Sequence, residues 1–285
     1  MPGKRQTPTV RLRRLAAELR SLRASSGLTR DEVVERTGIN VATMYRIEHA
    51  RVRPQTRTLR TLLDLYGVEK DQQAELVGLL RDARERGWLH AYQSELPEQY
   101  MNFIGFEGEA RSSWNYESLF VPGLLQTEDY ARAVIRGGFP TADRDEIERR
   151  IEVRMGRQDV LENDNPLELW GIVDEAALRR QVGGQAVMRT QLRRLLDAVE
   201  LPNITFQVIP FDVGAHAGMP GSFVFLQFAE PAIPDVIYVD SMAGELFLEE
   251  EGDVRRYRLV FEHLRAVAAS PDASRSLIAS IVAEK

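Results

Sequence analysis

GLTRDEVVERTGINVATMYRIEHARVR, residues 27–53, decides the fold of the N-terminal part of the chain. Thr29 can open a first helix with a capping box, because its hydroxyl accepts from the amide of Glu32 and the Glu32 carboxylate accepts from the Thr29 amide. Gly38 then tolerates the left-handed conformation that a sharp turn needs, and Asn40 can cap a second helix. The stretch therefore predicts two short helices joined by a tight turn.

The second of these helices has two unlike faces. Met44 and Ile47 lie three residues apart and are expected to face a core. The opposite face carries Val41, Ala42, Tyr45 and Arg46. A helix face with small side chains at its N-terminal end and an arginine near its C-terminal end can enter the major groove of DNA and reach base edges. The pattern indicates a helix-turn-helix, whereas the alternative, a small bundle with a solvated arginine-rich face, leaves the matching caps and turn unexplained.

This segment resembles the Xre and phage-repressor type of helix-turn-helix, which is a compact all-α bundle. Members pair an arginine late in the first helix with a glutamate that ends the recognition helix, and Arg23 and Glu48 occupy those places. The chain departs from the family at Ala50, where a left-handed glycine is usual. Either the helix ends differently here or Ala50 carries strain.

The same resemblance implies the contacts with double-stranded DNA. Base contacts are implied for the four residues of the outer face named above. Phosphate contacts are implied for Arg30, Asn40, Thr43, Arg51 and Arg53. A looser alignment brings Arg57 toward the minor groove.

Charge is distributed unevenly along the 285 residues. Residues 1–70 hold 15 lysines and arginines against 7 acidic residues, whereas residues 71–285 hold 22 against 36, which together give the net charge of −6. A basic head on an acidic body suits a DNA-binding regulator, because only the head is drawn to phosphates. A merely solvated face would explain solubility, but not why the asymmetry follows the motif.

Composition bounds the class of protein. An apolar share of 44% and an aromatic share of 8% are those of a globular protein, and no apolar run approaches the roughly 20 residues of a membrane span. The basic N-terminus leads into no apolar segment, so it is not expected to be a secretory signal. The chain contains no cysteine, which excludes disulfides and thiolate sites. A cytoplasmic protein, associated with the nucleoid when bound to DNA, is expected.

The expected fold is α+β overall, with three parts. Residues 1–70 are expected to form an all-α, Xre-like helix-turn-helix domain, residues 71–104 a helical connector, and residues 105–285 an α+β regulatory and dimerisation domain. In this last part a long charged helix is expected over 143–162. Short β-branched or aromatic runs bounded by turn residues predict a small sheet of four or five strands, at 167–173, 204–209, 223–228, 236–239 and 245–248.

The C-terminal part also resembles a known family. The matching blocks are VPGLLQTEDYARAV, RMGRQDVL, VDEAALRRQVGG, MRTQLRRLL, ITFQVIPFDVGAHAGMPGSFVFLQF and VRRYRLVFEHLRAVAASPDASRSLI. They are similar to the C-terminal domain of unknown function that follows an Xre helix-turn-helix in many actinobacterial regulators. Such regulators are often described as antitoxin-like and are commonly encoded beside a small protein of a second uncharacterised family. The resemblance implies a small companion protein as a partner.

No enzyme site, metal site or cofactor site is predicted. Asp174 and Glu175 follow a predicted strand, and Asp174 is more simply the N-cap of a helix. His216 lies in a glycine-rich loop without a nucleophile motif nearby, and the four histidines show no metal-ligand spacing. The loop 212–222 is a candidate ligand or partner loop, with a pocket mouth formed by Phe211, His216, Met219 and Phe223. A plain connection between strands is the other interpretation of this loop.

Together these patterns predict a sequence-specific DNA-binding transcriptional regulator. The docking geometry of helix-turn-helix regulators favours a homodimer on a near-palindromic operator, with two recognition helices in successive major grooves. The C-terminal domain is expected to bind a small companion protein; the alternatives are a small-molecule ligand and, with least support, an enzyme tethered to DNA.

Overall fold

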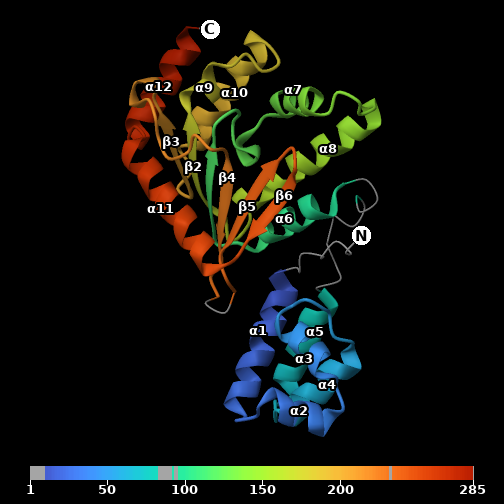
Figure 1. Cartoon of the computed structure of the whole chain (residues 1–285). Helices are drawn as coiled ribbons and strands as arrows, with labels where there is room; N and C mark the ends of the chain where they lie inside the picture. The colour runs from blue at the N-terminus through green and yellow to red at the C-terminus, as the bar shows by residue number, and fades with distance from the viewer. Residues whose placement is uncertain (1–9, 83–91, 93–95, 231–232, 285) are drawn as a thin grey trace. The chain divides into compact units, whose positions relative to one another are not determined.

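The computed structural model describes residues 10–82, 92, 96–230 and 233–284, and these form two compact units (Figure 1). The first unit takes in the described residues up to Glu109 together with the short segment Glu230–Pro234. The second takes in Ala110–Ala229 and the described residues from Asp235 onward. None of the helices within these ranges is long and apolar enough to cross a bilayer.

The first unit is a bundle of helices. Its elements are α1 (Val10–Ser25), α2 (Arg30–Thr37), α3 (Val41–Glu48), α4 (Thr56–Leu65), α5 (Lys70–Asp82) and α6 (Glu98–Glu109). Each of the first five helices gives apolar side chains to one shared core, which contains Leu15, Leu19, Val33, Met44, Ile47, Leu59, Leu62, Leu63, Leu76 and Leu80. The helical spacing of these residues is what makes the bundle, because each helix is apolar along one side only.

The units divide the chain at other places than the expected boundaries after residues 70 and 104. Leu76 and Leu80 of α5 are 4% and 1% exposed and complete the core of the bundle, so α5 packs as a bundle helix. α6 joins the same unit, because Arg11 pairs with Glu109 at 3.1 Å and the guanidinium of Arg13 lies 4.5 Å from the ring of Phe106. Much of the expected connector, 83–91 and 93–95, lies outside the described residues.

A six-stranded sheet forms the centre of the second unit. Its strands are β1 (Ser112–Glu117), β2 (Glu168–Asp174), β3 (Ile204–Ile209), β4 (Phe223–Gln227), β5 (Val236–Ser241) and β6 (Gly244–Leu248). They lie in the order β3-β2-β1-β4-β5-β6, in which β1, β2 and β3 are parallel and the pairs β1–β4, β4–β5 and β5–β6 are antiparallel. The sheet is therefore mixed, with its parallel half at the β3 side.

Helices cover both faces of this sheet. They are α7 (Glu128–Gly138), α8 (Arg144–Gly156), α9 (Glu175–Arg179), α10 (Gln185–Ala198), α11 (Glu251–Val267) and α12 (Pro271–Ala283). Val173 of β2 packs into one core with α7, α10 and α12, and its neighbour Ile172 packs into a second core with α11. This division follows from the strand itself, because successive side chains point to opposite faces.

The expected α+β fold is confirmed, but the expected count of four or five strands was wrong. The missing strand is β1, which lies in the middle of the sheet between β2 and β4. Its sequence SSWNYE places Ser113 and Asn115 in buried positions, at 1% and 7% exposure. Polar residues in a central strand break the apolar pattern by which strands are recognised. The helix expected over 143–162 is α8 followed by a 3-10 turn at Arg157–Leu161.

Candidate nucleic-acid interface

Two caps fix the helices that carry the interface. The Thr29 amide donates to Glu32 Oε2 at 2.7 Å and the Glu32 amide donates to Thr29 Oγ1 at 3.3 Å, so the predicted capping box is confirmed. These bonds to Thr29 lower the pKa of Glu32. Gly38 ends α2 with a φ of 69°, and Asn40 Oδ1 accepts from the Ala42 amide at 2.9 Å. The turn between α2 and α3 is therefore set by local bonds.

The two predicted faces of α3 are present. Met44 and Ile47 are 0% and 2% exposed, whereas Val41 is 49% and Tyr45 is 38% exposed. Ala42 and Arg46 are exposed beside them. This outer face forms one side of a groove lined by Arg23, Thr29, Arg30, Asp31, Val41, Ala42, Tyr45 and Arg46. The four residues predicted to reach base edges thus share one surface.

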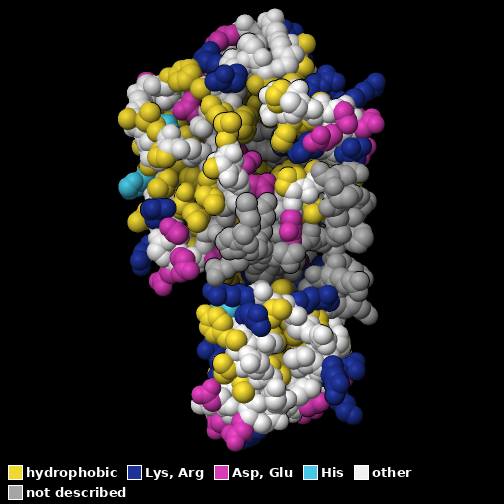
Figure 2. Space-filling view, turned by 45° about the vertical axis from the view of Figure 1, so that its right-hand side comes forward, with side chains coloured by type: hydrophobic (Ala, Val, Ile, Leu, Met, Phe, Trp, Pro, Cys, Tyr) yellow, Lys and Arg dark blue, Asp and Glu magenta, His cyan; other side chains and the backbone are white. Residues whose placement is uncertain are grey.

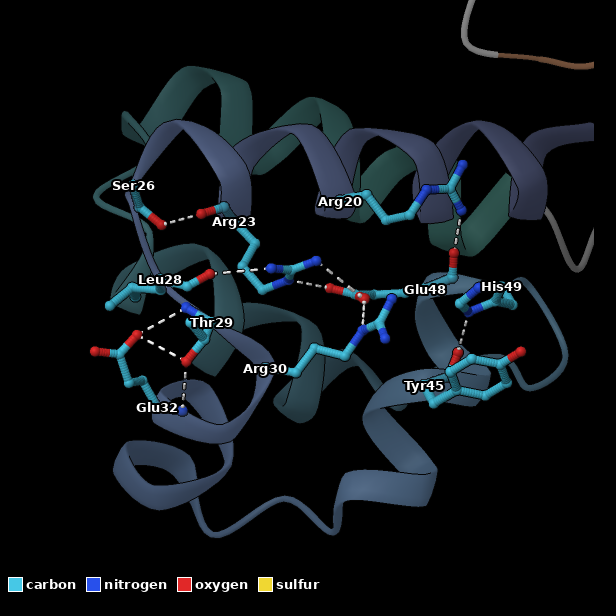
Figure 3. Close-up of polar contacts among 10 residues, drawn as sticks. All are labelled: Arg20, Arg23, Ser26, Leu28, Thr29, Arg30, Glu32, Tyr45, Glu48 and His49. Atoms are coloured by element: carbon cyan, nitrogen blue, oxygen red, sulfur yellow. Dashed lines mark hydrogen bonds and ion pairs between the residues drawn. The ribbon is translucent and has the colours of Figure 1, made fainter.

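Behind this groove the carboxylate of Glu48 holds two arginines (Figure 3). The Glu48 side chain is fully buried and accepts from Arg23 Nε and Arg30 Nε, each at 2.5 Å. Arg23 also donates to the Leu28 carbonyl at 3.0 Å, and Arg20 donates to the Glu48 carbonyl. The predicted pair Arg23–Glu48 is confirmed. Since one carboxylate shared by two guanidiniums ties α1, α2 and α3 together, Glu48 positions α3 in the bundle.

Sequence reasoning missed the bonds that Arg20 and Arg30 make to Glu48. Arg20 lies three residues before Arg23 and thus on the same side of α1, which was a usable signal. Arg30 was assigned only a phosphate contact, although its Nε is taken by Glu48. Arg30 nevertheless lines the same groove as the outer face of α3.

Tyr45 stands among cations on the outer face. The guanidinium carbons of Arg30 and Arg51 lie 5.5 and 5.4 Å from its ring centroid. His49 stacks on the ring at 3.9 Å, and its Nδ1 lies 2.7 Å from the Tyr45 carbonyl oxygen. Stacking and cation–π attraction hold the Tyr45 ring in place. A surface of aromatic and cationic groups results, which suits contact with nucleic acid.

Arg46 is fixed along the axis of α3. Its Nε donates to the Ala42 carbonyl at 3.2 Å and its Nη2 donates to Thr43 Oγ1 at 3.2 Å. The guanidinium thus lies over the first turn of the helix, where the small side chains Val41 and Ala42 leave room.

The remaining predicted phosphate contacts are scattered after α3. Arg51 and Arg57 are exposed, and Arg57 lies in the first turn of α4. Arg53 donates through Nη2 to the Leu80 carbonyl, so it links the segment after α3 to α5. Figure 2 shows basic and acidic side chains interspersed on the visible faces of both units, so the positive excess of residues 1–70 does not form one continuous patch on this face.

Ala50 adopts the left-handed conformation that glycine usually takes after the end of a helix. Its φ is 52°, and no other non-glycine residue in the described ranges has a positive φ. Ala50 donates to the Ile47 carbonyl at 3.0 Å and Arg51 donates to the Arg46 carbonyl at 2.7 Å, which closes α3. Of the two predicted possibilities, the left-handed end of the helix is the one present, and an alanine in this conformation is expected to carry strain.

Replacing Ala50 by glycine is expected to stabilise the first unit by about 0.5–1 kcal/mol, because glycine removes the cost of a left-handed alanine but loses one buried methyl group. Thermal unfolding of the full chain would measure the change. Ala24→Gly is the matched control, since Ala24 is exposed in α1 and glycine there should destabilise by up to about 1 kcal/mol. Equal shifts for both variants would contradict strain at Ala50.

The loop after β3 does not gather its four predicted residues on one surface. Phe211 and Met219 are 57% and 68% exposed, whereas Phe223 is 4% exposed and packs against Tyr257 with ring centroids 4.9 Å apart. The His216 side chain is also buried at 5% exposure. Phe223 and His216 therefore belong to the interior of the second unit.

His216 instead holds the loop on the sheet. Its Nε2 lies 3.4 Å from Asp174 Oδ2, and its Nδ1 accepts from the Gly218 amide at 3.2 Å. Asp174 Oδ1 accepts from the Ala176 amide at 2.8 Å, which confirms its predicted role as the N-cap of α9. Within the described residues no three His, Asp or Glu side chains are placed to hold a metal ion.

Comparison with known families gives two matches, one for each part of the chain. A helix-turn-helix domain matches residues 14–77, which include the groove and the Glu48 cluster. A domain of unknown function (DUF5753) matches residues 100–280. Neither the curated proteins nor the solved structures contain a match to the chain. Since the second match spans more than half of the sequence, the chain belongs to the DUF5753 family and carries a helix-turn-helix domain of the kind found in DNA-binding regulators.

Proposed function

We propose that this protein is a sequence-specific transcriptional regulator of the Xre type that reads DNA with the outer face of α3. The observation that carries the proposal is the exposed, groove-lining set Val41, Ala42, Tyr45 and Arg46, held from behind by buried Glu48. Hydrogen bonds from arginine and apolar contacts from small side chains are the two means by which a major-groove helix distinguishes bases. A cytoplasmic, non-enzymatic regulator is the corresponding proposal for the whole chain.

Selection of binding sites from a random duplex library with the full chain tests this function. We expect one enriched motif made of two inverted half-sites about 10 base pairs apart, because a homodimer would place two copies of α3 in successive major grooves. Light scattering should then give twice the chain mass of 32.4 kDa. A library that stays random after repeated rounds would refute sequence-specific reading.

A contact with a thymine methyl group is expected for Val41, a large apolar side chain of α3 that is 49% exposed. Burying one methyl-sized group contributes about 0.8 kcal/mol, or about fourfold in affinity. Exchanging the facing thymine of the selected site for deoxyuridine should therefore weaken wild-type binding about fourfold and leave Val41→Ala binding nearly unchanged. Equal losses in both proteins, measured by fluorescence anisotropy, would place the methyl contact elsewhere.

For the second unit we propose regulatory input from a small companion protein, as the resemblance to antitoxin-like actinobacterial regulators implies. Tagged protein purified from its native cell after nuclease treatment should retain such a partner, and the partner should change operator affinity. If no protein co-purifies and a metabolite raises the melting temperature instead, the small-molecule alternative is favoured. In both cases an effector acts only as far as it distinguishes the two states of the regulator.

A further inference from the structure

The outer face of α3 continues into the residue that follows the helix, His49. This histidine comes four residues after Tyr45 and eight after Val41, so the three side chains lie along one side of the helix. Its imidazole stacks on the Tyr45 ring, with the centroids 3.9 Å apart and the planes inclined by 26°. Tyr45 lines the groove, and His49 is partly exposed beside it. A titratable ring is therefore presented at the end of the proposed DNA-reading surface.

One hydrogen bond fixes which nitrogen of the His49 ring carries a hydrogen. Nδ1 lies 2.7 Å from the Tyr45 carbonyl oxygen, which is a full hydrogen bond. A carbonyl oxygen only accepts, so Nδ1 is the donor in the neutral ring as well as in the charged one. The proton-free nitrogen of the neutral ring is then Nε2. Among the residues that the structure describes, Nε2 has no hydrogen-bond partner.

The protonation of Nε2 decides what it can bind. Phosphate oxygens are acceptors, so a proton-free Nε2 cannot bond to them, whereas a protonated Nε2 donates a charge-assisted hydrogen bond. Histidine is the side chain whose charge ordinarily changes between pH 5 and pH 8. A bond from His49 to phosphate therefore needs one proton more than the neutral ring holds.

The charges around His49 favour an anion at this place. Arg20 of α1 donates to the carbonyl of the preceding residue, Glu48 (Figure 3). Arg30 of α2 and Arg51, which follows α3, lie 5.5 and 5.4 Å from the centroid of the ring on which His49 stacks. The buried Glu48 carboxylate is already shared by two guanidiniums. A phosphate beside His49 meets cations from three parts of the first unit, and its own charge favours the protonated imidazole.

We propose that His49 is a proton-dependent contact to a DNA phosphate, in which Nε2 of the charged ring donates to a phosphate oxygen while Nδ1 keeps its bond to the Tyr45 carbonyl. The proton comes from the solvent, so duplex binding and protonation of His49 strengthen each other. This inference rests on the DNA-binding function proposed for α3, and it makes the affinity of that site depend on pH. Because every duplex offers phosphates, the contact strengthens binding to selected and scrambled duplexes alike.

The affinity of the full chain for a duplex at pH 6 and at pH 8, measured by fluorescence anisotropy at constant salt, tests the contact. Wild-type binding should be about tenfold or more tighter at pH 6, because uptake of one proton changes affinity by up to about tenfold per pH unit. The gain is present at low pH and is lost as the pH rises, as expected for a base that acquires an anionic partner. His49→Gln, which cannot become charged, should lose this dependence. His263→Gln, which changes an exposed histidine of α11, is the matched control and should keep it.

The salt dependence separates a phosphate contact from a proton that acts only on the fold. One added phosphate contact steepens the slope of log affinity against log salt by about 0.9 for each first unit bound. The wild-type slope should therefore be steeper at pH 6 than at pH 8. His49→Lys, which is charged at both pH values, should show the steep slope at both, and His49→Gln the shallow one. The lysine variant also keeps the test valid if the glutamine variant fails to fold.

Three results would overturn the contact while leaving DNA binding intact. They are an affinity that is equal at pH 6 and pH 8, equal salt slopes at the two pH values, and a pH dependence that survives in His49→Gln. The last would assign the proton to another group, such as Glu117 in the second unit, whose pKa burial raises to about 7. If no duplex binds at either pH, the function proposed for α3 fails as well, so the two failures are distinguishable.

Discussion

Arg46→Ala is expected to weaken binding to the selected duplex by about 10- to 100-fold without lowering the melting temperature. An arginine that bonds a base edge contributes about 1–3 kcal/mol of discrimination. In the protein alone Arg46 is exposed and bonds only to the Ala42 carbonyl and Thr43 Oγ1 among the described residues, so its removal exposes no buried polar group. Fluorescence anisotropy at one fixed salt concentration measures the change.

A matched loss of charge elsewhere separates base reading from electrostatics. Arg255 lies in α11 of the second unit with 70% of its side chain exposed, and Arg255→Ala should leave affinity unchanged. Binding of Arg46→Ala to a scrambled duplex should fall much less than binding to the selected one, because only phosphate attraction is shared. Operator affinity within twofold of the wild type would show that α3 does not read the site through Arg46.

Removing the carboxylate behind the groove is expected to destabilise the first unit. Glu48→Ala leaves Arg23 and Arg30 without their shared acceptor, and breaking a buried ion pair costs about 3–5 kcal/mol. The Arg30 side chain is 38% exposed and can hydrate, so we expect about 2–4 kcal/mol. Charge reversal in Glu48→Lys should cost more, because it adds a cation beside these arginines.

Hydrogen exchange locates the effect of Glu48→Ala, since the chain has two compact units. Amides of α1, α2 and α3 should exchange faster in the variant, while amides of the sheet β1–β6 should not change. Glu35→Ala, which removes an exposed carboxylate from α2, is the control and should leave exchange unaltered. Unchanged protection in Glu48→Ala would mean that the buried pair does not hold the three helices together.

Local sequence signals made the helix-turn-helix of the first unit predictable. The Thr29–Glu32 capping box, Gly38 and the Asn40 cap lie within a dozen residues, and each is bonded as its residue type dictates. The sequence also identified Ala50 as an unusual residue at the end of α3, and only its backbone conformation had to come from the structure. The shared use of Glu48 by Arg20, Arg23 and Arg30 was harder to foresee, because it depends on how three helices converge.

The features that the sequence did not predict depend on contacts between residues that are far apart in the chain. β1 carries buried polar side chains, Ser113 and Asn115, between its aromatic ones, and its central place in the sheet depends on the pairing with β2 and β4. His216 and Phe223 were predicted to line a pocket mouth, but contacts with Asp174 and Tyr257 hold both side chains in the interior.

The ratio of affinities for the selected duplex and a scrambled duplex of equal composition, both measured with the full wild-type chain at the same salt concentration, tests sequence-specific reading by α3 most directly. A specific regulator is expected to prefer the selected duplex by about 10³-fold or more. Arg46→Ala should reduce this ratio at least tenfold. A wild-type ratio near one, with an affinity that depends on salt concentration but not on sequence, would mean that the first unit binds phosphates without reading bases.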